Sequence, residues 1–164
     1  MVSELLMTFE KSRIELFTKL ENATIPYPVV LRTYIKINGI TFHPEFVLDV
    51  RALARSCQFS GELDIFTCSC DMPLCAGIED GINVEHLNGD VIWKFYEPIS
   101  NKNHDELNDE EWEAIKVHYE LQFDLEHYCS NISLGIHKLK AMVSDSDLPA
   151  LSIHGFTEDQ LFRL

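Results

Sequence analysis

No apolar run in this chain approaches the roughly 20 residues that a helix needs to cross a bilayer. The first twenty residues carry scattered charges and no small-residue cleavage site, so they do not look like a signal peptide. Low-complexity runs and internal repeats are absent as well. These absences predict a cytoplasmic protein that has no membrane as a partner, and a length of 164 residues predicts a single domain.

Positive charge is scarce, because thirteen Lys and Arg residues face twenty-seven Asp and Glu residues and give a formal net charge of −14. A charge of this size repels nucleic acid, which is therefore not an expected partner, and attracts basic proteins at long range. Acidity that serves only solubility explains the same total. The hydrophobic content of 46% argues against disorder, so the expected molecule is a folded acidic domain.

Recognisable catalytic motifs are missing. The chain has no glycine-rich loop that would hold a phosphate, no His-Glu-x-x-His motif and no Gly-x-Ser-x-Gly motif. Seven histidines are scattered without the spacing of metal ligands. A Cys–His pair that meets only in the fold stays open. The sequence therefore favours a binding protein over an enzyme.

The pattern of apolar residues predicts an α+β fold, with a mostly antiparallel sheet of about six strands and helices packed on one face. Residues 3–21 fit either a helix or an extended segment, and the helix is favoured because it ends before two prolines. Within the one domain, residues 1–164, we expect an N-terminal helical segment (1–28), a core (29–143) and a C-terminal tail (144–164) with a short helix.

Two β-hairpins are predicted, at residues 29–42 and 82–95. Their turns are Asn38-Gly39 and Asn88-Gly89, and Asn-Gly supplies the positive φ angles of a type I′ turn. The strands on both sides of each turn alternate apolar and polar residues over most of their length.

Further strands are predicted at residues 63–68 and 115–123. The second of these has one apolar face and one polar face, which is typical of an antiparallel sheet with one solvated side. Trp93, in the second hairpin, is expected to anchor the core rather than to bind a ligand.

Two helices are predicted in the core. The first begins at His43-Pro44, with proline in the first turn, and ends near Cys57, which is expected to pack in the core. The second is capped by Asp124 and has an apolar stripe that ends at Val143. Gly135 falls on the polar side of this helix.

Cys68, Cys70 and Cys75 lie within eight residues. Five cysteines, an odd number, indicate reduced thiols or metal ligands rather than a disulfide framework. The simplest interpretation is packed cysteines in a reducing compartment. The second is a structural zinc ion held by the three thiolates with His86 as the fourth ligand, and the third is a redox pair of Cys70 and Cys75. No other cofactor is expected.

The same loop carries a resemblance to a protein family. The residues concerned are Ile65-Phe66-Thr67-Cys68-Ser69-Cys70, then Cys75-Ala76-Gly77-Ile78, and then Val91-Ile92-Trp93. They resemble a pattern of small bacterial proteins whose loop reads Cys-x-Cys-Gly-x-x-Gly-Cys-x-Gly-Ile, although Asp71 and Leu74 replace its glycines. Some of those proteins resemble immunity proteins of polymorphic toxin systems, including contact-dependent growth inhibition. The resemblance implies that this chain neutralises a cognate toxin.

Acidic residues concentrate between positions 105 and 126, where nine acids face one base, Lys116, for a charge of −8 in twenty-two residues. A solvated face explains this run, and so does a surface that covers the basic cleft of a nuclease. The predicted partner-binding residues are Asp105, Glu106, Asp109, Glu110, Glu111, Trp112, Glu113 and Glu120. We therefore expect an immunity protein that covers a basic nuclease domain, and the alternative is a zinc-binding structural or regulatory module. The sequence indicates no oligomeric state.

Overall fold

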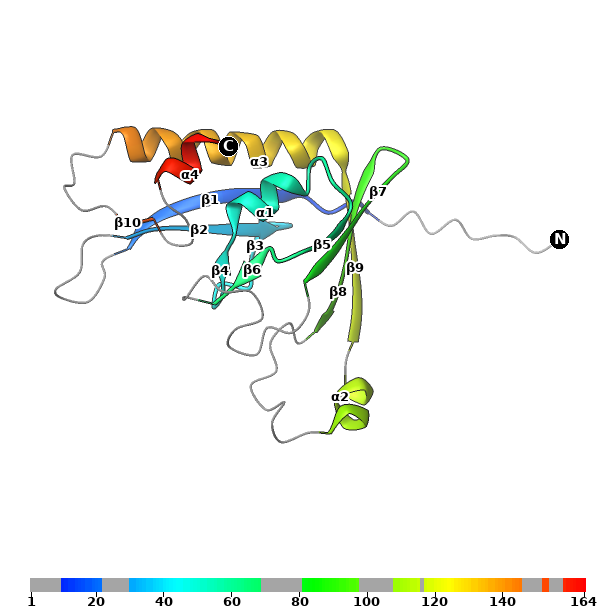
Figure 1. Cartoon of the computed structure of the whole chain (residues 1–164). Coiled ribbons are helices and arrows are strands. Elements are labelled where there is room, and N and C mark those ends of the chain that lie inside the picture. The colour runs from blue at the N-terminus through cyan, green and yellow to red at the C-terminus, as the bar shows by residue number, and fades with distance from the viewer. Residues whose placement is uncertain are drawn as a thin grey trace.

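The computed structural model describes residues 10–21, 30–68, 81–97, 108–115, 117–145, 152–153 and 158–164. Their strands form two four-stranded sheets and one two-stranded sheet, and their helices lie mainly beside the first sheet (Figure 1). Neighbouring strands are antiparallel except for one short parallel pair. The predicted α+β class and the mostly antiparallel pairing are confirmed, but the strands are divided between sheets instead of forming one.

The first sheet has the order β1-β2-β10, and β3 pairs with β2 as well. Its strands are β1 (Ile14–Glu21), β2 (Val30–Ile37), β3 (Ile40–Phe42) and β10 (Ser152–Ile153). The helix favoured over residues 3–21 is wrong from Ile14 onward, because β1 pairs with β2 along its whole length. Buried Ile14 and Leu16 alternate there with exposed Glu15, which is the period of a strand. The rest of the predicted helical segment 1–28 lies outside the described residues, except for residues 10–13.

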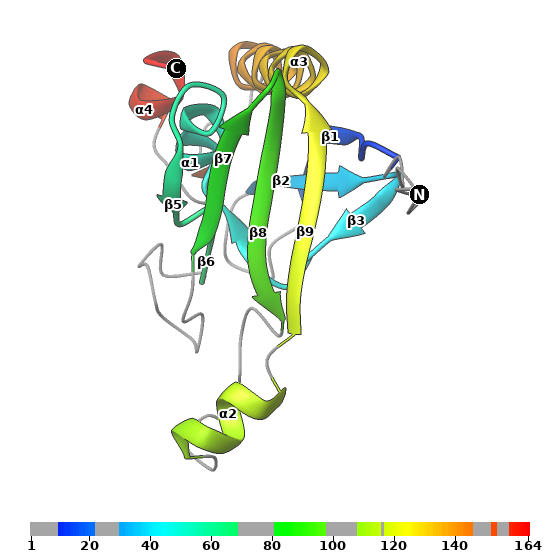
Figure 2. The ribbon, with the colours of Figure 1, turned by 90° about the vertical axis from the view of Figure 1, so that its right-hand side faces the viewer.

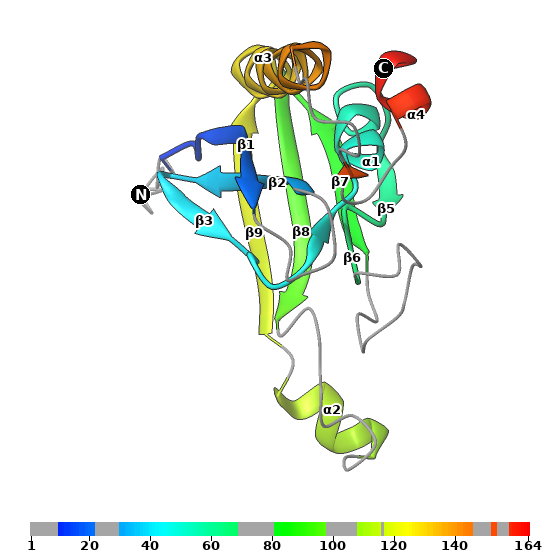
Figure 3. The same ribbon diagram turned by 90° about the vertical axis from the view of Figure 1, so that its left-hand side faces the viewer.

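The second sheet has the order β5-β7-β8-β9 and lies across the first (Figures 2 and 3). Its strands are β5 (Gly61–Leu63), β7 (Ile82–Leu87), β8 (Asp90–Glu97) and β9 (Val117–Asp124). A third sheet pairs only β4 (Val47–Leu48) with β6 (Phe66–Thr67). The predicted strand at residues 115–123 is therefore confirmed from Val117 onward.

Both predicted hairpins form around their Asn-Gly turns. Asn38 and Gly39 have φ angles of 52° and 82° between β2 and β3, and Asn88 and Gly89 have the same two values between β7 and β8. Positive φ at both central residues is the mark of a type I′ turn, whose twist matches that of the flanking strands.

Four helices occur in the described residues: α1 (Val50–Arg55), α2 (Asp109–Ile115), α3 (Leu125–Ser144) and α4 (Glu158–Phe162). The helix predicted to begin at Pro44 begins later, because the Asp49 carboxylate accepts hydrogen bonds from the Arg51 and Ala52 amides at 2.9 and 3.1 Å. Cys57 follows α1 and packs against the core, as expected. The N-cap of α3 is confirmed, since Asp124 Oδ1 accepts from the His127 amide at 3.0 Å.

One hydrophobic core joins residues of both large sheets with α1, α3 and α4. Trp93 on β8 is fully buried, so its predicted role as a core anchor is confirmed. The Trp93 ring contacts Phe123 and Tyr128 edge-on, with centroids 5.4 and 6.0 Å away. The Tyr128 hydroxyl accepts a hydrogen bond from Trp93 Nε1 at 3.0 Å and lies 2.6 Å from Ser56 Oγ, which itself donates to the Leu53 carbonyl.

Gly135 is buried against β1, which corrects the expectation that it lies on the polar side of the helix. A Cβ built at this position would lie 2.8 Å from the Cγ and Cδ2 atoms of Leu16, and closer still to its Cβ. Glycine is therefore what permits α3 to lie so close along β1 (Figure 1). The position faces the core because α3 contacts β1 on one side and α1 and α4 on another.

Candidate functional site

Five predicted binding residues are exposed, four on α2 at one end of the molecule and Glu120 midway along β9. Helix α2 lies beyond the ends of β8 and β9, on the far side from α3 (Figure 2). We call this region the acidic end, and its residues are Asp109, Glu110, Glu111, Glu113 and Glu120. Asp105, Glu106 and the side chain of Trp112 lie outside the described residues. The structure therefore shows that these five side chains are exposed, and their role in binding a partner stays a prediction.

Part of this acidity has a local structural cause. Asn108 Oδ1 accepts a hydrogen bond from the Glu111 amide at 2.9 Å, and Glu111 Oε2 accepts one from the Asn108 amide at 3.0 Å. This reciprocal arrangement is a capping box that fixes the start of α2. Asp109 and Glu110 occupy the first turn, where negative charge is favoured by the helix dipole. Glu111 is thus needed for the fold of α2, whereas Asp109 and Glu110 present their charge to solvent.

The acidic run of residues 105–126 does not form one patch. Asp124 and Glu126 lie at the start of α3, at the opposite end of β9 from α2. An eight-residue strand spans roughly 26 Å, about three times the Debye length of ~8 Å at physiological ionic strength. The acids at the two ends of β9 therefore act on a partner as separate groups.

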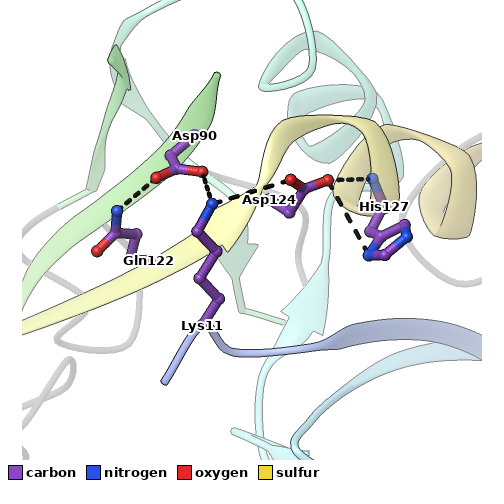
Figure 4. A network of polar contacts seen from close by, with 5 residues as sticks. All are labelled: Lys11, Asp90, Gln122, Asp124 and His127. Atoms are coloured by element: carbon purple, nitrogen blue, oxygen red, sulfur yellow. Dashed lines mark hydrogen bonds and ion pairs between the residues drawn. The ribbon is translucent and has the colours of Figure 1, made fainter. Parts of the chain in front are cut away.

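At the α3 end of β9, Lys11 lies between two carboxylates (Figure 4). Its Nζ atom is 2.5 Å from Asp90 Oδ1 and 3.9 Å from Asp124 Oδ2. Gln122 Nε2 donates to the other oxygen of Asp90 at 2.5 Å. The next residue, Ser12, donates its amide to the Gln122 carbonyl at 2.7 Å, so the segment before β1 is attached to the second sheet. This cluster was not predicted, because 79 residues separate Lys11 from Asp90 and no local pattern joins them.

The Asp90 carboxylate should make folding stability depend on acid pH. The hydrogen bond from Lys11, followed by that from Gln122, holds the pKa of Asp90 below its ordinary value of 3.8, although burial opposes the shift. A lowered pKa in the folded state stabilises the fold above the ordinary pKa, and this contribution is lost as the pH falls through the lower folded value. Asp90→Asn should therefore flatten the acid limb of the free energy of unfolding, measured by urea denaturation between roughly pH 2 and 6. Equal pH slopes in both proteins would contradict this role.

A groove of about 730 Å³ between β1, the β2–β3 turn and α3 contains some of the basic residues. Four of the chain's thirteen bases line it, together with two acids. These bases are Lys11, Arg13, Lys36 and Lys138. Lys11 is already paired with Asp90, and Asp124 lies 3.9 Å from the same ammonium group, so this groove has mixed charge.

The structure bears on two of the four predicted zinc ligands. Cys68 is disulfide-bonded, so the expectation that all five cysteines are reduced is wrong at this position, and its sulfur is not a thiolate ligand in this state. The Nε2 atom of His86, on β7, lies 2.8 Å from the Ser56 carbonyl oxygen, which leaves Nδ1 for any other partner. Cys70 and Cys75 lie outside the described residues. Within the described ranges no group of three metal-binding side chains occurs, and the zinc site stays a prediction.

Two free thiols, Cys57 and Cys129, meet where α1 ends beside α3. Cys129 Sγ donates to the Cys57 carbonyl oxygen at 3.7 Å. Burial, and then the neighbouring Cys129, raise the pKa of the Cys57 thiol, so this thiol stays protonated at neutral pH. Sequence reasoning placed Cys57 in the core but missed its neighbour, which is 72 residues away.

The comparisons with known proteins do not indicate a function, so the functional assignment rests on the surface of this chain. No family model, no curated protein and no solved structure matches this chain. No helix among the described residues is long and apolar enough to cross a membrane. What the chain does must therefore be inferred from its charges and its exposed strands.

Proposed function

We propose that this chain is an immunity protein, which binds a basic nuclease toxin in the cytoplasm and covers its active-site cleft. The observation that carries the proposal is the acidic end, where exposed carboxylates stand on a helix that projects beyond the sheet (Figure 2). A projecting acidic helix fits a concave basic cleft better than a flat acidic face does. The cysteine loop resembles that of a family of small bacterial proteins, some of which resemble immunity proteins of toxin systems, and this resemblance agrees with the proposed function.

The acidic end supplies two contributions to such a complex. Its carboxylates take the place of the phosphates that a nuclease cleft binds, and their charge steers the encounter and raises the association rate. Dissociation depends more on apolar contacts that become buried. Val117 and Tyr119 provide these beside the acids, since they are 52% and 43% exposed on β9.

A triple neutralisation tests the steering role. The variant Asp109→Asn, Glu110→Gln, Glu120→Gln should lower the association rate about tenfold or more at low salt. Glu111 is left unchanged because it caps α2. The measurement is stopped-flow association with the catalytically inactivated nuclease domain of the toxin that the proposal expects to be encoded beside this chain's gene.

A matched control separates local charge from net charge. Neutralising the exposed Glu10, Glu15 and Asp145 makes the same change, from −14 to −11, away from the acidic end. This control should keep an association rate within about twofold of the natural chain, with the same steep loss on adding salt. Equal losses in both variants, a flat salt dependence, or no binding at all would overturn the proposal.

A further inference from the structure

Strand β9 is an edge strand among the described residues. It ends the order β5-β7-β8-β9 and pairs with β8 along its whole length (Figure 2). On its outer side, the backbone pairing described is one bridge between Ser12 and Phe123, near the α3 end. From Val117 to Leu121, no described strand pairs with the outer side of β9. An open edge is a template for pairing with another chain.

The register shows which backbone groups of β9 face outward. Leu87 and Asp90 flank a two-residue turn and form a hydrogen-bonded pair, so the odd-numbered residues of β8 direct their amides and carbonyls at β9. Phe95 and Tyr119 are opposite each other, and the amides and carbonyls of His118 and Glu120 therefore point away from β8. The hydrogen bond from the Ser12 amide to the Gln122 carbonyl follows the same alternation. This bond shows that an outward carbonyl of β9 accepts a backbone hydrogen bond from another part of the chain.

The two faces of this edge differ in chemistry. Tyr119 stacks on Phe95, with ring centroids 5.8 Å apart and planes 16° apart, on the face that includes the core residues of β8. Val117 lies on this face too, and both side chains are largely exposed. His118 and Glu120 are exposed on the other face. A strand added here would place alternate side chains against an apolar surface and against a carboxylate.

Charge decides which strand fits. Next to this edge lie Glu120 and the acids of α2, so an incoming segment with Lys or Arg at alternate positions is attracted. A second copy of this chain carries the same net charge of −14, so two copies repel each other at long range. The edge therefore favours a basic partner over self-association.

We propose that the outer edge of β9, at His118 and Glu120, binds an extended strand of the partner in which apolar and basic residues alternate. This inference rests on the proposed function, because the partner strand belongs to the same basic nuclease domain. Main-chain hydrogen bonds supply the affinity of such strand addition, and the alternating side chains supply its specificity. The acidic end then steers the partner, and β9 holds it.

Two measurements test strand addition with the inactivated nuclease domain already named. Hydrogen–deuterium exchange on the natural chain should show the His118 and Glu120 amides at least about tenfold slower to exchange in the complex. Among variants, His118→Pro removes one outward N–H without removing a bond to β8, and proline is tolerated on an edge strand. Its affinity should fall about tenfold, while His118→Ala, which loses only the ring beside Tyr96, should bind nearly as well as the natural chain.

Each possible result either supports strand addition or overturns a stated part of the proposal. Protected amides together with a loss specific to proline support strand addition. Binding without protection of these amides overturns strand addition and leaves the proposed function standing. Absence of binding by the natural chain overturns both. A free chain that sediments as a dimer and already protects the same amides shows that a second copy occupies the edge, which overturns the partner assignment. If His118→Pro does not fold, the exchange measurement on the natural chain still decides.

Discussion

Replacing Tyr128 with phenylalanine is expected to lower the free energy of unfolding by about 2–4 kcal/mol, although only one oxygen is lost. The residue is 1% exposed, and its hydroxyl accepts from the fully buried indole N–H of Trp93. Because Ser56 Oγ donates to the Leu53 carbonyl, the Tyr128 hydroxyl is the donor in its 2.6 Å contact with Ser56. The substitution thus leaves a buried donor without an acceptor and a buried oxygen without a donor. Urea denaturation measures the loss.

The control for this prediction is Tyr119→Phe, which removes the same oxygen from a side chain that is 43% exposed. It should change the unfolding free energy by less than about 0.5 kcal/mol, because water replaces the lost contacts of an exposed hydroxyl. Burial also raises the pKa of Tyr128, so the buried ring stays a neutral phenol across the usual pH range. A loss for Tyr128→Phe no larger than that for Tyr119→Phe would show that the buried hydrogen bonds contribute little.

Replacing Gly135 with alanine is expected to destabilise the fold by about 2 kcal/mol, against the trend for helices. In an open helix, alanine is about 1 kcal/mol more favourable than glycine. Here the new methyl group would lie 2.8 Å from two side-chain carbons of Leu16, which is 3% exposed, and closer still to its Cβ. Because a change of rotamer does not move the Leu16 Cβ, α3 must move away from β1, and this movement weakens the core. The measurement is again the midpoint and slope of urea unfolding.

Ser130→Ala, at an exposed position of the same helix, provides the matched comparison, because it changes helix propensity without touching β1. It should leave stability unchanged or slightly raised, by a few tenths of a kcal/mol. Adding Leu16→Ala to Gly135→Ala should not restore stability, since the contact with the Leu16 Cβ remains. A Gly135→Ala variant more stable than the natural chain would show that the helix and strand separate easily.

The parts of the fold that follow from neighbouring residues could be predicted. The Asn38-Gly39 and Asn88-Gly89 turns determine their hairpins because few residue pairs adopt positive φ twice. The cap of α3 at Asp124 was also found, since its acceptor and donor are three residues apart. These local signals give correct predictions because the tertiary contacts of the folded chain favour the same local structure.

The predictions that were wrong concern residues whose structure depends on contacts with distant parts of the sequence. Residues 14–21 have apolar side chains compatible with a helix, and they become a strand because β2 supplies eight paired positions. Gly135 lies near the border of the apolar stripe, and only the approach of Leu16 places it inside. At the candidate site, the acids were found from composition, but the open edge of β9 required the strand order, which a single sequence does not contain.

Among the described residues, negative charge is uneven along β9, because α2 carries acids without a base whereas Lys11 offsets Asp90 at the α3 end. This uneven distribution acts as an electric dipole. In the field of a positively charged partner, a dipole experiences a torque as well as an attraction. The chain should therefore rotate with α2 foremost before contact, and fewer encounters should begin in an unproductive orientation. Exchanging bases and acids between the two ends would keep the net charge of −14 and reverse this alignment.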